Sequence, residues 1–200
     1  MNYFSNRLPG RSRGRRDFFG SVSERIALIS SDARRSLARE ILSPVFDVPG
    51  LRFFSLQKSD PAAPETFPLT DLMGENEDFS DTAALVANLD LVISVDTAVV
   101  HLAAALGKPV WLLDRFDPDW RWLAGRCDSP WYPTLRVYRQ PHPGARDRVI
   151  AEVVRDLRDF SGKSDLVTRA GLDQAAEHPR PPNRCSTPAH LLVADPHHDR

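Results

Sequence analysis

The stretch Leu91-Val-Ile-Ser-Val-Asp-Thr-Ala-Val-Val-His-Leu-Ala-Ala-Ala-Leu-Gly-Lys-Pro-Val-Trp-Leu-Leu113 decides the fold. Residues 91–95 and 110–113 are almost entirely apolar, as are strands that are buried on both faces of a parallel sheet. Between them, residues 98–106 are predicted to form a short helix that Gly107 ends in the left-handed conformation. The stretch therefore predicts a strand–helix–strand unit of a parallel α/β sheet.

A polar turn separates the first of these strands from the helix. Asp96 and Thr97 follow the strand directly, at the place where parallel α/β sheets bind their ligands. Unpaired backbone N–H groups and the helix dipole favour an anion there. His101 lies one helical turn after Thr97, so the two side chains share a face. The three residues predict a phosphate-binding site. The alternatives are a helix cap for Asp96 and a hydrogen-bonded, partly buried side chain for His101.

Strands and helices alternate along the rest of residues 21–160. Strands are expected at 26–30, 51–56, 67–72 and 135–139, and helices at 36–46, 78–89 and 146–160. Ser80 or Asp81 is expected to cap the helix at 78–89. This alternation predicts an α/β fold with a Rossmann-like parallel sheet and helices on both faces.

Three regions are expected along the chain: a basic leader at 1–20, an α/β domain at 21–160 and a tail at 161–200. Arginines without acids precede Asp17 in the leader, and prolines lie among polar residues in the tail. Both compositions are typical of disorder. The leader also fits a mitochondrial transit peptide or a nucleic-acid-binding arm.

Composition argues against several classes of protein. The formal net charge of −1 gives no overall attraction to nucleic acid or to an anionic membrane. No apolar run is long enough to span a bilayer, and no G-x-G-x-x-G motif of a dinucleotide-dependent oxidoreductase follows a strand. The two cysteines, and the histidines around Cys185, match no metal-binding spacing. We therefore expect no metal, no other cofactor, no nucleic-acid partner, no membrane span and a cytoplasmic location.

Two further features bear on ligand binding. Lys58 follows the predicted strand at 51–56, where its charge either pairs with a phosphate or is solvated on the surface. Asp114 follows the strand at 110–113 and would repel a phosphate if it faced the site. The loop between the last two strands carries aromatic residues that either stack on a ligand or pin the loop to the sheet: Trp120, Trp122, Trp131 and Tyr132.

Residues 94–111, Ser-Val-Asp-Thr-x-x-x-His-Leu-Ala-x-Ala-Leu-Gly-Lys-Pro-Val-Trp, resemble the signature of the family 9, heptosyltransferase-like glycosyltransferases. Residues 117–126, Asp-Pro-Asp-Trp-Arg-Trp-Leu-Ala-Gly-Arg, and 128–134, Asp-Ser-Pro-Trp-Tyr-Pro-Thr, resemble a narrower group. That group is the carboxyl-terminal part of bacterial proteins that join tetratricopeptide repeats to such a domain. Residues 53–58 and 79–85 also match it, and the resemblance covers about residues 32–160.

The resemblance implies a GT-B fold, in which two Rossmann-like domains face a cleft, and it covers the carboxyl-terminal, donor-binding half. It implies that Asp96, Thr97 and His101 line the pocket for the diphosphate and sugar of a nucleotide-sugar donor. The helix N-terminus can stabilise the departing nucleoside diphosphate, so no metal is required in principle. The acceptor, whether a sugar, a lipid-linked molecule or a protein, stays open. The family's catalytic base is expected in the other half, so no catalytic residue is assigned.

Two functions stay open at this point. The first is the donor-binding domain of a glycosyltransferase, inactive alone because a separate amino-terminal acceptor domain is missing. The second is a non-catalytic remnant or interaction module that binds a nucleotide weakly. This chain lacks the Trp/Gly-containing first strand and loop of its relatives, and Ala98 stands where they often have glycine. A truncated or frame-disrupted gene would explain the leader and the tail together.

Overall fold

One parallel sheet organises the part of the chain that the computed structural model describes, residues 24–29, 39–57, 68–71, 76 and 78–169. Its six strands are β1 (Glu24–Ile29), β2 (Leu51–Ser55), β3 (Leu69–Asp71), β4 (Leu91–Ser94), β5 (Val110–Asp114) and β6 (Leu135–Arg139). They lie in the order β3-β2-β1-β4-β5-β6, and every neighbouring pair is parallel. This strand order is that of the Rossmann fold. The predicted Rossmann-like α/β sheet is therefore confirmed.

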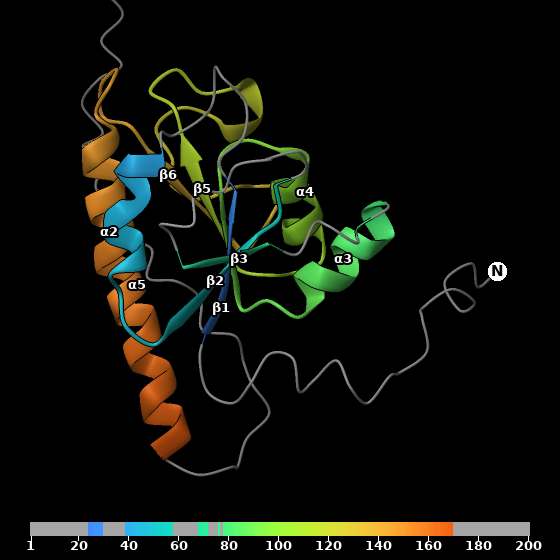
Figure 1. Ribbon diagram of the computed structural model, residues 1–200. Helices are drawn as coiled ribbons and strands as arrows, with labels where there is room; N and C mark the ends of the chain where they lie inside the picture. The colour runs from blue at the N-terminus through green and yellow to red at the C-terminus, as the bar shows by residue number, and fades with distance from the viewer. Residues whose placement is uncertain (1–23, 30–38, 58–67, 72–75, 77, 170–200) are drawn as a thin grey trace, which may run out of the picture.

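Helices cover both faces of the sheet, as Figure 1 shows. One face carries α2 (Ser43–Phe46), which follows the 3-10 turn η1 (Arg39–Leu42), and the long helix α5 (Arg146–Arg169). The other face carries α3 (Phe79–Ala87) and α4 (Ala98–Ala105). A second 3-10 turn, η2 (Trp120–Trp122), lies in the connection between β5 and β6. The sheet is thus the middle layer of a three-layer arrangement.

The two hydrophobic layers explain why the central strands are apolar along their whole length. Leu91 and Ile93 pack in the layer under α2 and α5, whereas Val92, between them, packs in the layer under α3 and α4. Successive side chains of a strand point to opposite faces of its sheet. Every residue of β4 is therefore buried, and the expected pairing of β4 with β5 is present.

Two helix starts differ from the expectation. Asp78 rather than Ser80 or Asp81 caps α3, because its Oδ1 accepts hydrogen bonds from the Ser80 and Asp81 N–H groups at 2.7 and 3.0 Å. The helix expected at 36–46 is a 3-10 turn followed by the four-residue α2 over its described residues. Pro44 explains the break, since a proline is favoured only in the first turn of a helix.

The carboxyl-terminal helix is longer than predicted. It was expected to end at Phe160, and α5 continues through residues 161–169 to Arg169. The hydroxyl of Ser161 donates a hydrogen bond of 3.0 Å to the Pro49 carbonyl, which ties this part of the helix to the turn before β2. Lys58, the leader at 1–20 and residues 170–200 of the tail lie outside the described residues. None of the described helices is both long and apolar enough to cross a lipid bilayer.

Candidate functional site

The carboxyl end of β4 lies where the strand order of the sheet reverses. β1 and β4 are neighbours; β2 and β3 extend the sheet beyond β1, while β5 and β6 extend it beyond β4. Open α/β sheets bind ligands outside the carboxyl ends of their strands at such a switch point. Asp96 and Thr97 lie in the turn between β4 and α4, so the structure places them at this position.

Hydroxyl groups shape the turn between β4 and α4. Ser94 is fully buried; its Oγ donates to the Val95 carbonyl at 2.8 Å and lies 3.1 Å from Thr97 Oγ1. Thr97 occupies the N-cap position of α4, but its side chain makes no capping hydrogen bond. The side chain of Thr97 therefore does not cap α4, and Asp96, the cap of the alternative interpretation, precedes the capping position. An N-terminus without this cap retains donor groups for an anion.

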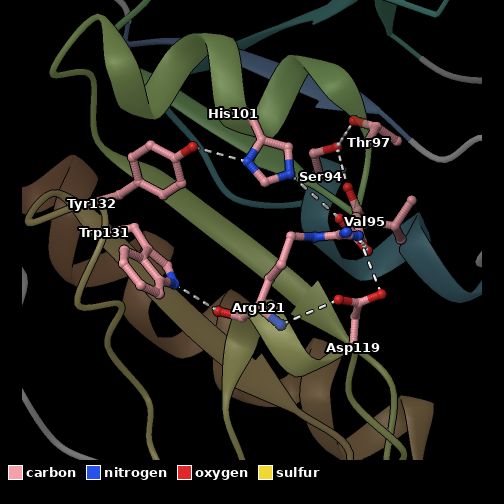
Figure 2. Close-up of polar contacts among 9 residues, drawn as sticks. Ser94, Val95, Thr97, His101, Asp119, Arg121, Trp131 and Tyr132 are labelled. Carbon is pink, nitrogen blue, oxygen red and sulfur yellow. Dashed lines mark hydrogen bonds and ion pairs between the residues drawn. The ribbon is translucent and has the colours of Figure 1, made fainter.

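Asp96 brings charged groups from two elements together. Figure 2 shows two of these groups, the side chains of His101 and Arg121, on either side of the turn before α4. Its side chain is 15% exposed, and its Oδ2 lies 3.4 Å from Nη2 of Arg121 in the loop between β5 and β6. Its Oδ1 lies 3.9 Å from Nε2 of His101 on α4. Arg121 Nη2 also lies 3.2 Å from Asp119 Oδ2. The start of α4 is therefore flanked by a mixed cluster of two carboxylates, a guanidinium and an imidazole.

His101 is held by the same loop. Its Nδ1 lies 3.0 Å from the Tyr132 hydroxyl, and its ring stacks on Trp122 with centroids 5.2 Å apart and planes 18° from parallel. The side chain remains 34% exposed, with Nε2 toward Asp96. The structure thus brings His101 and Asp96 together. It also shows the hydrogen-bonded, partly buried histidine of the alternative interpretation.

The aromatic loop divides into anchoring and exposed residues. Trp122 is 1% exposed and belongs to the core under α4, with Tyr132 packed against it. Trp120 and Trp131 are 71% and 60% exposed, and Trp131 Nε1 donates to the Arg121 carbonyl at 3.1 Å. Pinning the loop is therefore the role of Trp122 and Tyr132, while Trp120 and Trp131 leave aromatic surface open beside the charged cluster.

Asp114 does not present a free charge to the site. It is buried; its Oδ2 accepts a hydrogen bond of 3.0 Å from Nε of Arg139 and lies 2.9 Å from Nη2 of the same guanidinium. Burial raises the pKa of Asp114, and the Arg139 guanidinium opposes that rise. Arg139 also donates to the Trp122 carbonyl at 3.1 Å, so the pair fixes the loop that carries Arg121. The repulsion of phosphate that Asp114 could exert is offset by this pairing.

A small, shallow hollow adjoins this ion pair. Arg115 and Arg146 line it together with Val95 and Asp114, so it lies at the carboxyl edge of the sheet toward α5. Its lining includes neither Thr97 nor His101. The expectation that Thr97 and His101 share one cleft over Asp96 stays a prediction. Among the described residues, no group of three or more His, Cys, Asp or Glu side chains is arranged to hold a metal ion.

Arg121 is the residue of this site that the sequence did not single out. The sequence around Arg121 could have drawn attention to it, because Asp119 and two tryptophans lie with it in a stretch of four residues. Such composition indicates a fixed loop with a positive charge. It does not indicate that the loop folds back over α4, which depends on the packing of Trp122 and Tyr132.

Part of the chain is similar to a known protein family. Residues 61–113, which include Asp96 and His101, match the model of the family described as "Glycosyltransferase family 9 (heptosyltransferase)". Protein FlbA of Caulobacter vibrioides is 30% identical over 151 residues, which cover 71% of this chain and 25% of FlbA. The chain therefore spans only a quarter of the length of this curated relative.

Solved structures show a similar fold. The glycosyl transferase family 9 structure from Veillonella parvula aligns with a TM-score of 0.50 at 10% identity, over 72% of this chain and 47% of that one. The structure of E. coli heptosyltransferase WaaC with ADP aligns with a TM-score of 0.47 at 20% identity, over 71% and 45% of the two chains. The described sheet thus shares the fold of about half of the Veillonella parvula structure.

Proposed function

We propose that this chain is the nucleotide-sugar-binding domain of a family 9-like glycosyltransferase, the carboxyl-terminal half of a GT-B fold. The observation that carries the proposal is the position of Asp96 and His101. They lie at the switch point of a Rossmann-like sheet, within the segment that matches the family 9 model. A glycosyltransferase of this kind transfers a sugar from a nucleoside diphosphate to an acceptor hydroxyl.

In this proposal the diphosphate of the donor lies at the start of α4. Backbone N–H groups of the first helical turn and the Thr97 hydroxyl donate to its oxygens. His101 Nε2 supplies a further donor beside them, and Lys58 supplies a point charge from the segment after β2. Donors already in place where charge develops stabilise the departing nucleoside diphosphate. The chemistry of this half is therefore binding and leaving-group stabilisation, without a metal or another cofactor.

The acceptor side of the reaction belongs to another domain in this proposal. Transfer needs a general base for the acceptor hydroxyl, which contributes about 10²–10⁴-fold to the rate, and both reactants must be held in line. The described residues form one Rossmann-like sheet, whereas a GT-B enzyme places its cleft between two. We expect the 200-residue chain alone not to transfer sugar at a useful rate. A cytoplasmic location and a protein context with tetratricopeptide repeats belong to the same proposal.

A second candidate function is an interaction module that binds a nucleotide weakly. The observation that favours it is the exposed apolar surface of the β5–β6 loop: Phe116, Trp120 and Trp131 are 47%, 71% and 60% exposed. Tryptophan is enriched among the residues that dominate protein–protein binding. A radiolabelled-donor assay with candidate acceptors, run with and without a candidate acceptor domain, separates the two. Turnover in the reconstituted pair supports the enzyme, and weak nucleotide binding without turnover supports the module.

The direct test of donor binding is calorimetry with a panel of nucleoside diphosphates: ADP, GDP, UDP and CDP. We expect the wild type to bind at least one of them, and the double variant Thr97→Ala, His101→Ala to bind it at least 10-fold more weakly. His142→Ala is the matched control, because His142 is exposed and follows β6, which is two strands away from β4 in the sheet. Equal affinities for the wild type and the double variant would refute the site.

A further inference from the structure

The backbone of Arg121 is fixed on both sides. Its N–H donates to Asp119 Oδ1 at 3.1 Å, and its carbonyl accepts from Trp131 Nε1 at 3.1 Å. The next residue, Trp122, is buried, and its carbonyl accepts from Arg139 at 3.1 Å. These contacts therefore fix the backbone at Arg121 without help from its guanidinium.

The guanidinium of Arg121 is, by contrast, loosely engaged. Both of its ion pairs use one nitrogen, Nη2, at 3.4 Å from Asp96 and 3.2 Å from Asp119. Charge-assisted hydrogen bonds between nitrogen and oxygen are commonly about 2.7–2.9 Å long. Nε is buried and has no hydrogen-bond partner within the described part of the chain, so it is closed to a ligand. Neither ion pair uses Nη1, which leaves that nitrogen for another acceptor. A guanidinium has five N–H donors in a fixed fork, so this one retains capacity for another acceptor.

Charge also matters at this position. Asp96 carries a carboxylate where the proposed function places a diphosphate, and like charges at close range disfavour binding. Arg121 is the permanent cation paired with that carboxylate, since an arginine side chain stays protonated in proteins. Its planar fork matches phosphate oxygens in a bidentate arrangement that a point charge cannot make.

We propose that Arg121 is a further ligand-binding residue of the donor site, and that its guanidinium binds the diphosphate directly. The inference rests on the proposed function and deepens it. Asp96 and Asp119 hold the guanidinium beside α4, and the diphosphate engages the donors that these two carboxylates leave free. Arg121 then compensates the charge of Asp96 and contributes binding free energy through the same side chain.

A structural role for Arg121 makes a different prediction. If Arg121 acted only by tying the loop through its ion pair with Asp119, then removing either partner would weaken ligand binding alike. Asp119→Asn separates the two roles, because asparagine keeps the Oδ1 acceptor for the Arg121 N–H and removes the charge. Direct binding predicts that Asp119→Asn leaves the affinity unchanged or raises it, since a competitor for the guanidinium is lost.

The test is calorimetry with inorganic pyrophosphate and with the nucleoside diphosphate from the panel above that binds most tightly. We expect Arg121→Gln to weaken both by about 10- to 100-fold, the effect of losing charge-assisted hydrogen bonds. Arg121→Lys keeps the charge without the fork and should show a smaller loss. Arg126→Gln is the matched control, because Arg126 lies in the same loop and pairs with Asp128 instead. Thermal unfolding establishes whether each variant is folded. If Arg121→Gln does not fold, the affinities of Arg121→Lys and Asp119→Asn test the inference in its place.

Each outcome separates the inference from the proposed function. Weaker binding by Arg121→Gln, with Asp119→Asn and Arg126→Gln unimpaired, supports direct contact. Equal losses for Arg121→Gln and Asp119→Asn overturn it in favour of a structural role. A third outcome is that the double variant Thr97→Ala, His101→Ala binds more weakly while both Arg121 variants bind like the wild type. This outcome overturns the inference and leaves the proposed function standing. A wild type that binds none of the nucleoside diphosphates overturns both.

Discussion

The hydroxyl of Tyr132 lies 3.0 Å from Nδ1 of His101, although 31 residues separate the two in the chain. This contact attaches the β5–β6 loop to the middle of α4, and stacking of His101 on Trp122 reinforces it. The hydrogen bond at one ring nitrogen determines the role of the other. When Tyr132 donates to Nδ1, the proton of a neutral His101 lies on Nε2, the nitrogen that faces Asp96.

Tyr132→Phe tests this relationship, because it removes the hydroxyl and keeps the ring. We expect the free energy of unfolding to fall by about 1 kcal/mol, the usual net contribution of one hydrogen bond. We also expect weaker binding of the nucleoside diphosphate. Without the Tyr132 hydroxyl, the proton of the imidazole ring is no longer directed to Nε2, the nitrogen that would donate to the ligand. Urea denaturation and calorimetry measure the two effects. An unchanged affinity would show that Tyr132 does not orient His101 for the ligand.

A buried ion pair joins β6 to α5. Arg136 Nη1 lies 2.7 Å from Asp156 Oδ2, which also accepts a hydrogen bond of 3.0 Å from the Tyr138 hydroxyl. Asp156→Ala leaves Arg136 buried without this carboxylate, so we expect destabilisation by about 3–5 kcal/mol. Asp159→Ala is the control, because Asp159 is exposed on the same helix. Similar unfolding midpoints for the two variants in urea would contradict the predicted importance of this pair.

Glu24, at the start of β1, gives the protein a pH-dependent stability. Burial, with a smaller contribution from Asp90, raises the pKa of Glu24 from 4.5 to about 7. Between these values the unfolded chain has released a proton that the folded protein keeps, so stability falls as the pH rises from 4.5 through 7. Glu24→Gln should remove this loss and stabilise the protein at pH 8 more than at pH 4, as measured by urea denaturation. A stability difference that is the same at both pH values would contradict it.

The strand–helix–strand unit at 91–113 could be predicted because its strands are buried on both sides and its helix has a glycine stop. Gly107 does adopt a positive φ of 73° after α4. The strand order could not be read in this way, because β1 pairs with β4, which follows it only after β2 and β3 in the chain. Hydrophobic periodicity gives the elements of a sheet and says little about their neighbours.

The candidate site was predictable in part for the same reason. Asp96 and His101 lie within one local unit, so their proximity follows from the end of a strand and the pitch of a helix. Arg121 joins them from a loop without periodicity, whose course depends on where Trp122 is buried and on the hydrogen bonds of Arg139. The end of α5 was missed for a similar reason, since Ser161 bonds to a turn more than a hundred residues earlier.

The most direct test of the central claim is a map of where a nucleoside diphosphate binds. A two-dimensional amide NMR spectrum of the wild-type chain, titrated with the diphosphate that binds most tightly, provides it. The account predicts that the largest shifts fall on residues 94–101 and 119–132, around α4 and the loop over it. Shifts centred instead at the opposite edge of the sheet, where Lys108 donates to the Leu89 carbonyl and Arg25 pairs with Asp90, would contradict it. The absence of any shift at saturating diphosphate would contradict it equally.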